Sequence, residues 1–89
     1  MFTFYTDPGH GWLQVSLADI NAVDLIVGAI SGYSYRQGAT FYLEEDCDAG
    51  KFLAAYRTKH GHEPKIVERN DGGFIRGLAR LDVIRGGLR

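Results

Sequence analysis

Strand-like and turn-like segments alternate at the start of the chain. Residues 2–6 have the aromatic and β-branched content of a β-strand, and a strand-like apolar pattern resumes at Trp12 and runs to Leu17. Between these segments, Pro8 fixes φ at the first corner of a turn, and Gly9 accepts a positive φ at the second. The pattern therefore predicts an N-terminal β-hairpin.

The spacing of apolar positions then changes to three and four, which is typical of an amphipathic helix. Five β-branched residues carry this spacing: Ile20, Val23, Ile26, Val27 and Ile30. Ser16 or Asp19 is suitably placed to cap the helix, and Gly28 and Gly32 indicate where it ends. We therefore expect a helix over residues 17–30, built from residue types that are only mediocre helix formers.

A second hairpin is expected in the middle of the chain. Its aromatic and apolar positions are Tyr33 and Tyr35 on the first strand, with Phe41 and Leu43 on one face of the returning strand and Tyr42 on the other. The four residues 36–39, which include Gly38, supply the turn between the two strands.

A second helix is expected directly after this hairpin. Asp46 is the predicted N-cap, and the charge of Asp48 favours the positive end of the helix dipole. Gly61 is the expected left-handed stop, and Pro64 follows it. The apolar stripe of this helix consists of Phe52, Leu53 and Tyr56.

The remaining segments complete a mixed pattern. Residues 64–70 are predicted to form a strand and residues 70–73 a turn, whereas residues 74–84 fit either a short helix or an irregular tail. The order β-β-α-β-β-α-β predicts a two-layer α+β domain. We expect a mostly antiparallel sheet of four to five strands with one or two helices on one face. One domain spans residues 1–89 and ends in an Arg-rich segment, about 74–89.

Length and composition limit the number of domains, the cellular compartment and the partners that we expect. Eighty-nine residues allow one core, and oligomerisation is the usual support for so short a chain. The single cysteine cannot form an intramolecular disulfide, which favours a reducing compartment. Because no apolar run approaches a membrane span and the first residues do not resemble a signal peptide, we expect a cytoplasmic protein with no membrane partner. Residues 1–50 carry a net charge of −6 and residues 51–89 a net charge of +5, so the two halves can attract one another or different partners.

Three groups of residues invite a chemical interpretation. Asp7 could orient His10 as a general base of a hydrolase in the DPGHG loop, but this loop matches no complete phosphate or catalytic motif, so a turn is preferred. His60 and His62 form an HxH pair with no second ligand pair, so neither a metal nor a cofactor is expected. Cys47 lies among four carboxylates that oppose thiolate formation, so it is interpreted as a small buried residue rather than a nucleophile.

Two surfaces could bind a macromolecule. The acidic run over residues 44–48 fits a docking site for a partner protein and a solvated helix-capping turn equally well, and calcium-loop spacing is absent. Arginines late in the chain, together with the hairpin aromatics, have the composition of a single-strand nucleic-acid surface. These arginines are Arg76, Arg80, Arg85 and Arg89. The sequence pI of about 6.3 argues against nucleic acid as the partner.

Three segments resemble a group of short proteins of tailed bacteriophages and prophages. They are DPGHGWLQV, YSYRQGATFYLEEDCDAG and FLAAYRTKHG, and the resemblance covers roughly residues 4–62 but not the tail after Arg69. It carries no catalytic residue over to this chain. It implies a phage accessory factor that binds a host protein in the bacterial cytoplasm, a class that includes inhibitors of host defence such as anti-CRISPR proteins.

The leading expectation is therefore a non-enzymatic protein that binds a host or viral protein. The expected contact residues are Tyr33, Tyr35, Tyr42, Glu44, Glu45 and Asp48. The alternatives are a small nucleic-acid-binding domain that uses the C-terminal arginines and, third, a hydrolase centred on Asp7 and His10.

Overall fold

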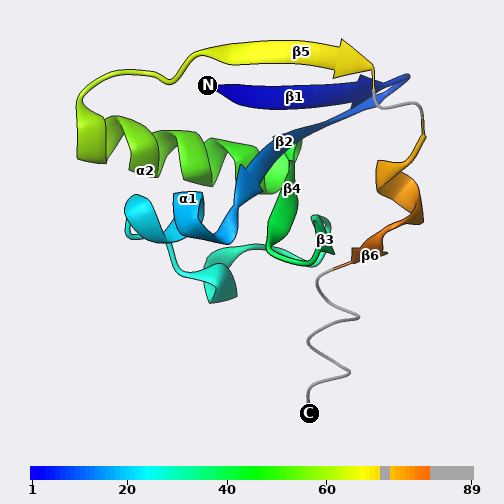
Figure 1. Ribbon diagram of the computed structural model, residues 1–89, viewed down its shortest axis with the longest axis horizontal. Coiled ribbons are helices and arrows are strands. Elements are labelled where there is room, and N and C mark those ends of the chain that lie inside the picture. The colour runs from blue at the N-terminus through cyan, green and yellow to red at the C-terminus, as the bar shows by residue number, and fades with distance from the viewer. Residues whose placement is uncertain (71–72, 81–89) are drawn as a thin grey trace.

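Six strands form one sheet in the order β5-β1-β2-β4-β3-β6 (Figure 1). The strands are β1 (Phe2–Asp7), β2 (His10–Ser16), β3 (Tyr35–Gln37), β4 (Thr40–Glu44), β5 (Ile66–Asn70) and the two-residue β6 (Ala79–Arg80). Only the β1–β5 pair is parallel, and the other four pairs are antiparallel. This computed structural model describes residues 1–70 and 73–80. The α+β class and the mostly antiparallel sheet predicted from the sequence are confirmed.

The two hairpins are confirmed with small changes. Strands β1 and β2 are joined by Pro8 and Gly9, and Gly9 has the positive φ of 103° that its position in the turn requires. The backbone N–H of His10 donates to the Asp7 carboxylate at 3.1 Å, which closes the turn. In the second hairpin the turn is shorter than predicted, because the sheet pairing already begins at Gln37 opposite Thr40.

The first helix is much shorter than predicted. Helix α1 (Leu17–Ala22) begins at the N-cap Ser16, whose side chain accepts from the backbone of Asp19 while the Asp19 side chain accepts from Ser16. Asp24 has a φ of +61°, which is incompatible with a continuing helix. The following apolar residues are instead folded back through a 3₁₀ turn, η1 (Val27–Ala29), and Ile30 is buried without helical periodicity. The predicted helix over residues 17–30 is therefore wrong beyond Ala22.

The second helix is confirmed at its C-terminal end but not at its cap. Helix α2 (Gly50–His60) ends at Gly61, which has a φ of 77°. A π-helical turn, η2 (Glu45–Ala49), precedes α2, and its N-cap is Glu44 rather than Asp46. The longer Glu44 side chain reaches two consecutive backbone N–H groups, which satisfies donors that would otherwise be unpaired.

Alternation along the strands divides the apolar residues between two faces of the sheet. One face carries the larger cluster, in which Leu13 and Phe41 of the sheet and Phe52 of helix α2 are completely buried. The opposite face carries a smaller cluster of Trp12, Tyr42 and Ile75. Helices α1 and α2 lie together on one side of β2 and β4, and the segment 73–80 lies on the other (Figure 1).

The segment 73–80 is ordered by this second cluster. It contains a 3₁₀ turn, η3 (Ile75–Gly77), followed by β6, so neither the predicted short helix nor an irregular tail describes it. Ile75 is completely buried against the sheet. Arg85 and Arg89, which belong to the predicted nucleic-acid surface, lie outside the described residues.

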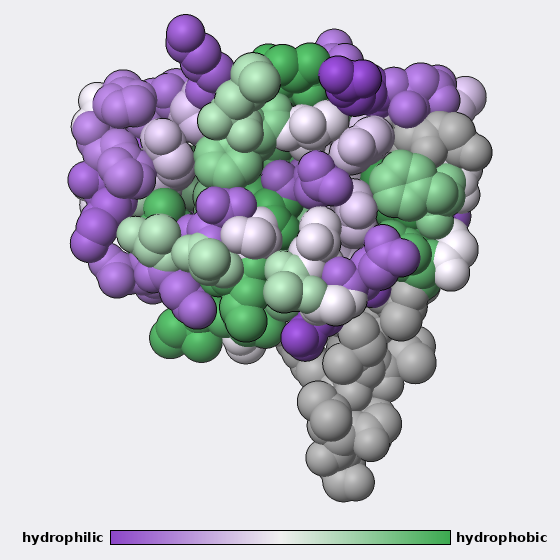
Figure 2. Space-filling view, viewed as in Figure 1, coloured by the Kyte–Doolittle hydropathy of each residue, from purple (hydrophilic) through white to green (hydrophobic). Residues whose placement is uncertain are grey.

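Polar residues cover the helix-bearing end of the molecule. Hydrophilic side chains gather over the C-terminal end of α2, where Arg57, Lys59 and His60 occupy the last turn (Figure 2). Within residues 1–70 and 73–80, the helices fall short of the length and apolar content that a bilayer crossing requires.

Gly11→Ala should lower the free energy of unfolding by about 1–3 kcal/mol, because β2 packs too closely on Phe4 to admit a side chain. A Cβ at residue 11 would lie 2.4 and 2.5 Å from two ring carbons of Phe4. Gly50→Ala is the matched control: it lies in helix α2 with no atom within 4 Å of the new Cβ, and we expect a gain of about 0.5–1 kcal/mol. Urea unfolding of both variants measures the difference, and equal stabilities would contradict the packing of Phe4 on Gly11.

Candidate functional site

A cavity of about 370 Å³ opens on the sheet face opposite the helices. We call it the acidic–aromatic pocket. Its lining residues are His10, Trp12, Tyr33, Tyr35, Glu44, Asp46, Cys47 and Arg76. They come from four separate segments: β2, the start of β3 with the loop before it, the junction of β4 with η2, and η3. The pocket therefore exists only because the sheet brings these segments together.

Trp12 is the buried aromatic centre of the pocket. It pairs with Glu44 across the β2–β4 ladder, so the two side chains share a face of the sheet. The His10 ring is stacked with it at a centroid distance of 6.0 Å, and the Tyr35 ring meets it edge-on at 6.2 Å. Its indole N–H is buried without a hydrogen-bond acceptor among the described residues. Trp12 thus contributes aromatic surface to the site rather than a polar contact.

Arg76 fastens η3 to the first hairpin. Its Nε donates to Asp7 Oδ2 at 2.6 Å, and a terminal guanidinium nitrogen lies 2.5 Å from His10 Nδ1. The guanidinium carbon is 5.3 Å from the centroid of the Trp12 ring, a cation–π distance. The hydrogen bond and charge of Arg76 hold the pKa of the Asp7 carboxyl below its ordinary value. Asp7 therefore stays ionised and neutralises Arg76 at physiological pH.

This arrangement also limits what His10 can do. A guanidinium can only donate hydrogen bonds, so His10 Nδ1 must accept from Arg76 and the neutral ring carries its proton on Nε2. Asp7 Oδ1 lies 4.0 Å from His10 Nδ1, too far for a hydrogen bond. Asp7 therefore does not orient His10 through a hydrogen bond, and both side chains are instead hydrogen-bonded to Arg76.

Carboxylates and a thiol line the opposite wall. Glu44 Oε2 accepts from the backbone N–H groups of Asp46 and Cys47, both at 2.9 Å. The Asp46 carboxylate is exposed and makes no hydrogen bond or ion pair with residues 1–70 or 73–80. Cys47 is exposed rather than buried, which corrects the prediction. Desolvation by neighbouring atoms, the hydrogen bond to Glu44 and the charges of Asp48 and Asp46 raise the pKa of the Cys47 thiol, so it is a poor nucleophile at neutral pH.

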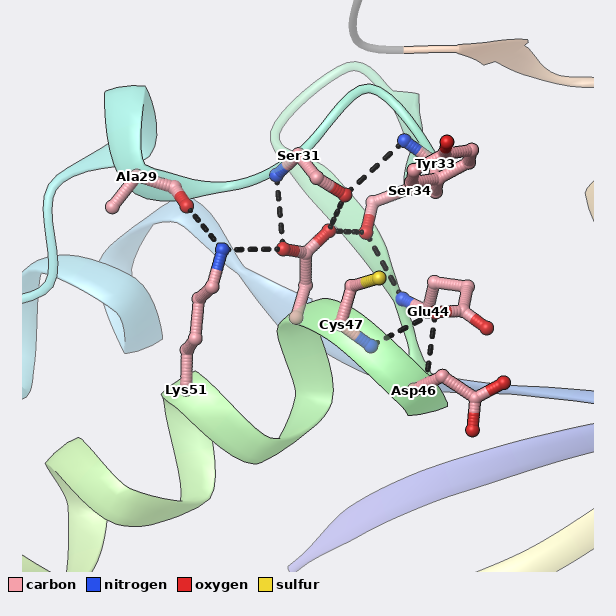
Figure 3. A network of polar contacts seen from close by, with 9 residues as sticks. Ala29, Ser31, Tyr33, Ser34, Glu44, Asp46, Cys47 and Lys51 are labelled. Carbon is pink, nitrogen blue, oxygen red and sulfur yellow. Dashed lines mark hydrogen bonds and ion pairs between the residues drawn. The ribbon is translucent and has the colours of Figure 1, made fainter.

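Asp48 is buried in a network of polar contacts instead of facing a partner as predicted. Figure 3 shows its partners Ser31, Ser34 and Lys51. Its side chain is completely buried and accepts from Ser31 N at 2.9 Å, from Ser31 Oγ at 2.6 Å and from Ser34 Oγ. Lys51 Nζ lies 3.2 Å from the same carboxylate. Burial alone would raise the pKa of Asp48, but the hydrogen bonds from the serines and Lys51 outweigh it and lower that pKa. Asp48 is therefore a structural carboxylate.

Ser34 connects this network to the pocket. Its hydroxyl donates to Asp48 and accepts from the backbone N–H of Glu44 at 2.9 Å. It lies between Tyr33 and Tyr35 in the chain, so a single buried residue holds the tyrosine segment against the β4–η2 junction. This connection explains why residues distant in sequence form one wall of the pocket.

The six predicted contact residues separate into three groups. Tyr33, Tyr35 and Glu44 line the pocket together, as expected for one surface. Glu45 is exposed but lies outside the lining. Tyr42 and Asp48 are buried, Tyr42 within the Trp12 cluster and Asp48 within the serine network, so both are corrections to the predicted contact surface.

The residues of the predicted nucleic-acid surface also separate in the structure. Arg76 of the predicted nucleic-acid surface lines the pocket and pairs with Asp7, while Arg80 pairs through its backbone with Tyr35 in the sheet. Sequence reasoning missed the contribution of Trp12. The only signal in the sequence was the position of Trp12, directly after the DPGHG turn.

No group of three histidine, cysteine, aspartate or glutamate side chains in the described part of the chain could hold a metal ion. No protein-family model matches the chain, and no significant match was found among curated proteins or solved structures. The chemistry of the site therefore rests on its own residues.

Asp7→Asn should lower the free energy of unfolding only at pH values where Asp7 is ionised. Because the pKa of Asp7 is lowered by folding, its stabilising contribution is fully present above the unfolded value of 3.8 and is lost as the pH falls through the folded value. Urea midpoints of wild type and Asp7→Asn should thus differ at pH 6, and the difference should shrink as the pH falls below 3.8. In an Arg76→Met background the difference should shrink, and an unchanged difference would contradict the Asp7–Arg76 pairing.

Proposed function

We propose that this chain is a non-enzymatic binding protein that uses the acidic–aromatic pocket to engage a protein partner. The observation that carries the proposal is the combination of three aromatic rings with two carboxylates, Glu44 and Asp46, around one concave surface. Aromatic anchors surrounded by polar groups are typical of the residues that dominate protein–protein binding energy. Tyr33, which is 62% exposed at this surface, is the natural anchor.

The state of the reactive side chains supports binding over catalysis. His10 uses its Nδ1 lone pair to accept from Arg76, and Cys47 has a raised pKa. A general base needs a free lone pair, and a cysteine nucleophile needs a lowered pKa. Neither requirement is met in this arrangement.

The resemblance to short proteins of tailed phages and prophages suggests where the partner is to be sought. We propose a bacterial host protein or a viral protein, in the cytoplasm of the infected cell, and include components of host defence such as CRISPR effectors. An effect on host defence would follow from occupying a partner surface, without any chemical step.

Affinity capture with matched variants tests the proposal. The full-length tagged protein, a Tyr33→Ala/Asp46→Lys double variant and a Glu68→Lys control are expressed in phage-infected cells, and captured proteins are compared by mass spectrometry. All three changed residues are exposed, and Glu68 pairs with Phe4 on the helix-bearing face, away from the pocket. We expect a partner that wild type and the control retain and the double variant loses. Identical captured sets for all three proteins would refute the proposal.

Nucleic-acid binding should be weak. The charge of Arg76 is neutralised by Asp7, and two carboxylates line the same cavity. A phosphate group would therefore be repelled by charges of its own sign. We expect oligonucleotide affinities no tighter than the non-specific range of about 10⁻⁴–10⁻⁶ M at physiological salt. Fluorescence anisotropy with single-stranded DNA and RNA measures this. Sub-micromolar binding with a steep salt dependence that flattens in Arg80→Ala/Arg85→Ala would favour the nucleic-acid alternative instead.

A further inference from the structure

We propose that the acidic–aromatic pocket receives one arginine side chain of the protein partner. This inference rests on the function proposed above and specifies the chemistry that the pocket recognises. The occupant is a guanidinium group that lies against the aromatic rings and pairs with the carboxylates at the β4–η2 junction.

The charge balance of the pocket favours a cation. The positive charge of Arg76 is balanced by its ion pair with Asp7. Glu44 and Asp46 form no ion pair with residues 1–70 or 73–80. Two uncompensated carboxylates therefore remain around the cavity at neutral pH, and an anionic ligand would be repelled by them.

The aromatic lining favours a flat cation. Trp12, Tyr33 and Tyr35 present rings to the cavity or its rim, and a cation over such a ring is attracted by its negative face. A guanidinium can stack on a ring and donate in its own plane to a carboxylate at the same time, whereas a lysine ammonium is a compact, strongly hydrated point charge. Arginine therefore uses both features of the wall.

The chain itself contains one example of this geometry. The guanidinium of Arg76 lies over Trp12 while its Nε donates to the carboxylate of Asp7 at 2.6 Å. A partner arginine would repeat the same ring-plus-carboxylate contact on the other wall, with Tyr33 or Tyr35 as the ring and Asp46 as the carboxylate. At about 370 Å³ the cavity lies at the small end of ligand pockets, which suits a side chain better than a nucleotide-sized ligand.

An NMR titration of the full-length protein with three capped amino acids tests this. The probes are the N-acetyl amides of arginine, lysine and citrulline, and citrulline has the shape of arginine without its charge. We expect arginine amide to bind with a dissociation constant of about 1–10 mM and to shift the resonances of Trp12 and Tyr33. Lysine should bind more weakly and citrulline not measurably. Citrulline or lysine binding as tightly as arginine, or no arginine binding below about 50 mM, would overturn the inference.

Variants connect the binding to the proposed wall. Asp46→Asn and Tyr33→Leu should each weaken arginine binding about two- to fivefold, because each removes one exposed contact. Glu68→Gln, on the opposite face, should leave it unchanged. Equal weakening by Glu68→Gln would show a non-specific charge effect and overturn the inference.

The outcomes distinguish this inference from the proposed function. Loss of a captured partner in the Tyr33→Ala/Asp46→Lys variant without arginine binding would refute the arginine inference and retain protein binding. Specific arginine binding with no partner lost in that variant would retain the pocket chemistry and refute the proposed function.

Discussion

Asp48→Ala should lower the free energy of unfolding by about 3–5 kcal/mol, because it removes a completely buried carboxylate that accepts several hydrogen bonds. The change leaves two serine hydroxyls and the backbone N–H of Ser31 without their acceptor, and the Ser34 hydroxyl among them is completely buried. For a domain of 89 residues this is a large share of the expected stability. Urea denaturation followed by circular dichroism measures it.

Asp46→Ala is the matched control for this prediction. It makes the same substitution two residues earlier in the same turn, at an exposed carboxylate that makes no hydrogen bond with the described residues. Its stability should stay within about ±0.5 kcal/mol of wild type. If Asp46 capped the helix as its sequence position predicted, the loss would be about 1 kcal/mol. A small effect of Asp48→Ala together with a larger effect of Asp46→Ala would contradict the observed network.

Ile75→Ala should cost about 2–5 kcal/mol, because it empties the centre of the second hydrophobic cluster. Ile75 is completely buried in one cluster with Trp12 and Tyr42 and is the only fully buried apolar residue of the segment 73–78. Loosening η3 also withdraws Arg76 from Asp7 and His10, so the pocket should lose one wall. Urea unfolding reports the loss of stability, and the Trp12 fluorescence spectrum reports the greater exposure of its indole.

Ile26→Ala provides the control for this second prediction. It deletes the same atoms from a side chain that is 74% exposed, so its effect should stay within about ±0.5 kcal/mol. Equal losses for Ile75→Ala and Ile26→Ala would mean that the segment after residue 73 does not pack on the sheet in solution.

Local signals predicted the elements whose determinants lie within a few residues. Gly9 and Gly61 were assigned to positions that need positive φ, and both have it. Ser16 was a candidate cap, and it caps α1. By contrast, the spacing of apolar residues over 17–30 predicted too long a helix, because side chains such as Val23 and Ile30 can be buried by a chain that folds back as well as by a helix.

The sequence predicted which types of residue would form the site, but not which individual side chains face it. The acidic run and the hairpin tyrosines were correctly singled out, and Tyr33, Tyr35 and Glu44 do share one cavity. The sequence could not separate Asp46 from Asp48, since both are aspartates in the same turn. The π-helical turn orients one toward solvent and the other toward Ser31 and Ser34, and this depends on a loop 14 to 17 residues away.

Turn residues and strand periodicity act over a few positions, so the α+β class, both hairpins and the C-terminal end of the main helix could be predicted from the residues alone. Three features emerge from the three-dimensional arrangement of the sheet: the second core on its opposite face, the pairing of Arg76 with Asp7 across 69 positions, and the pocket that these contacts enclose. Such contacts depend on strand order and register. Those are fixed by the packing of the whole sheet and not by the residues on either side of a motif.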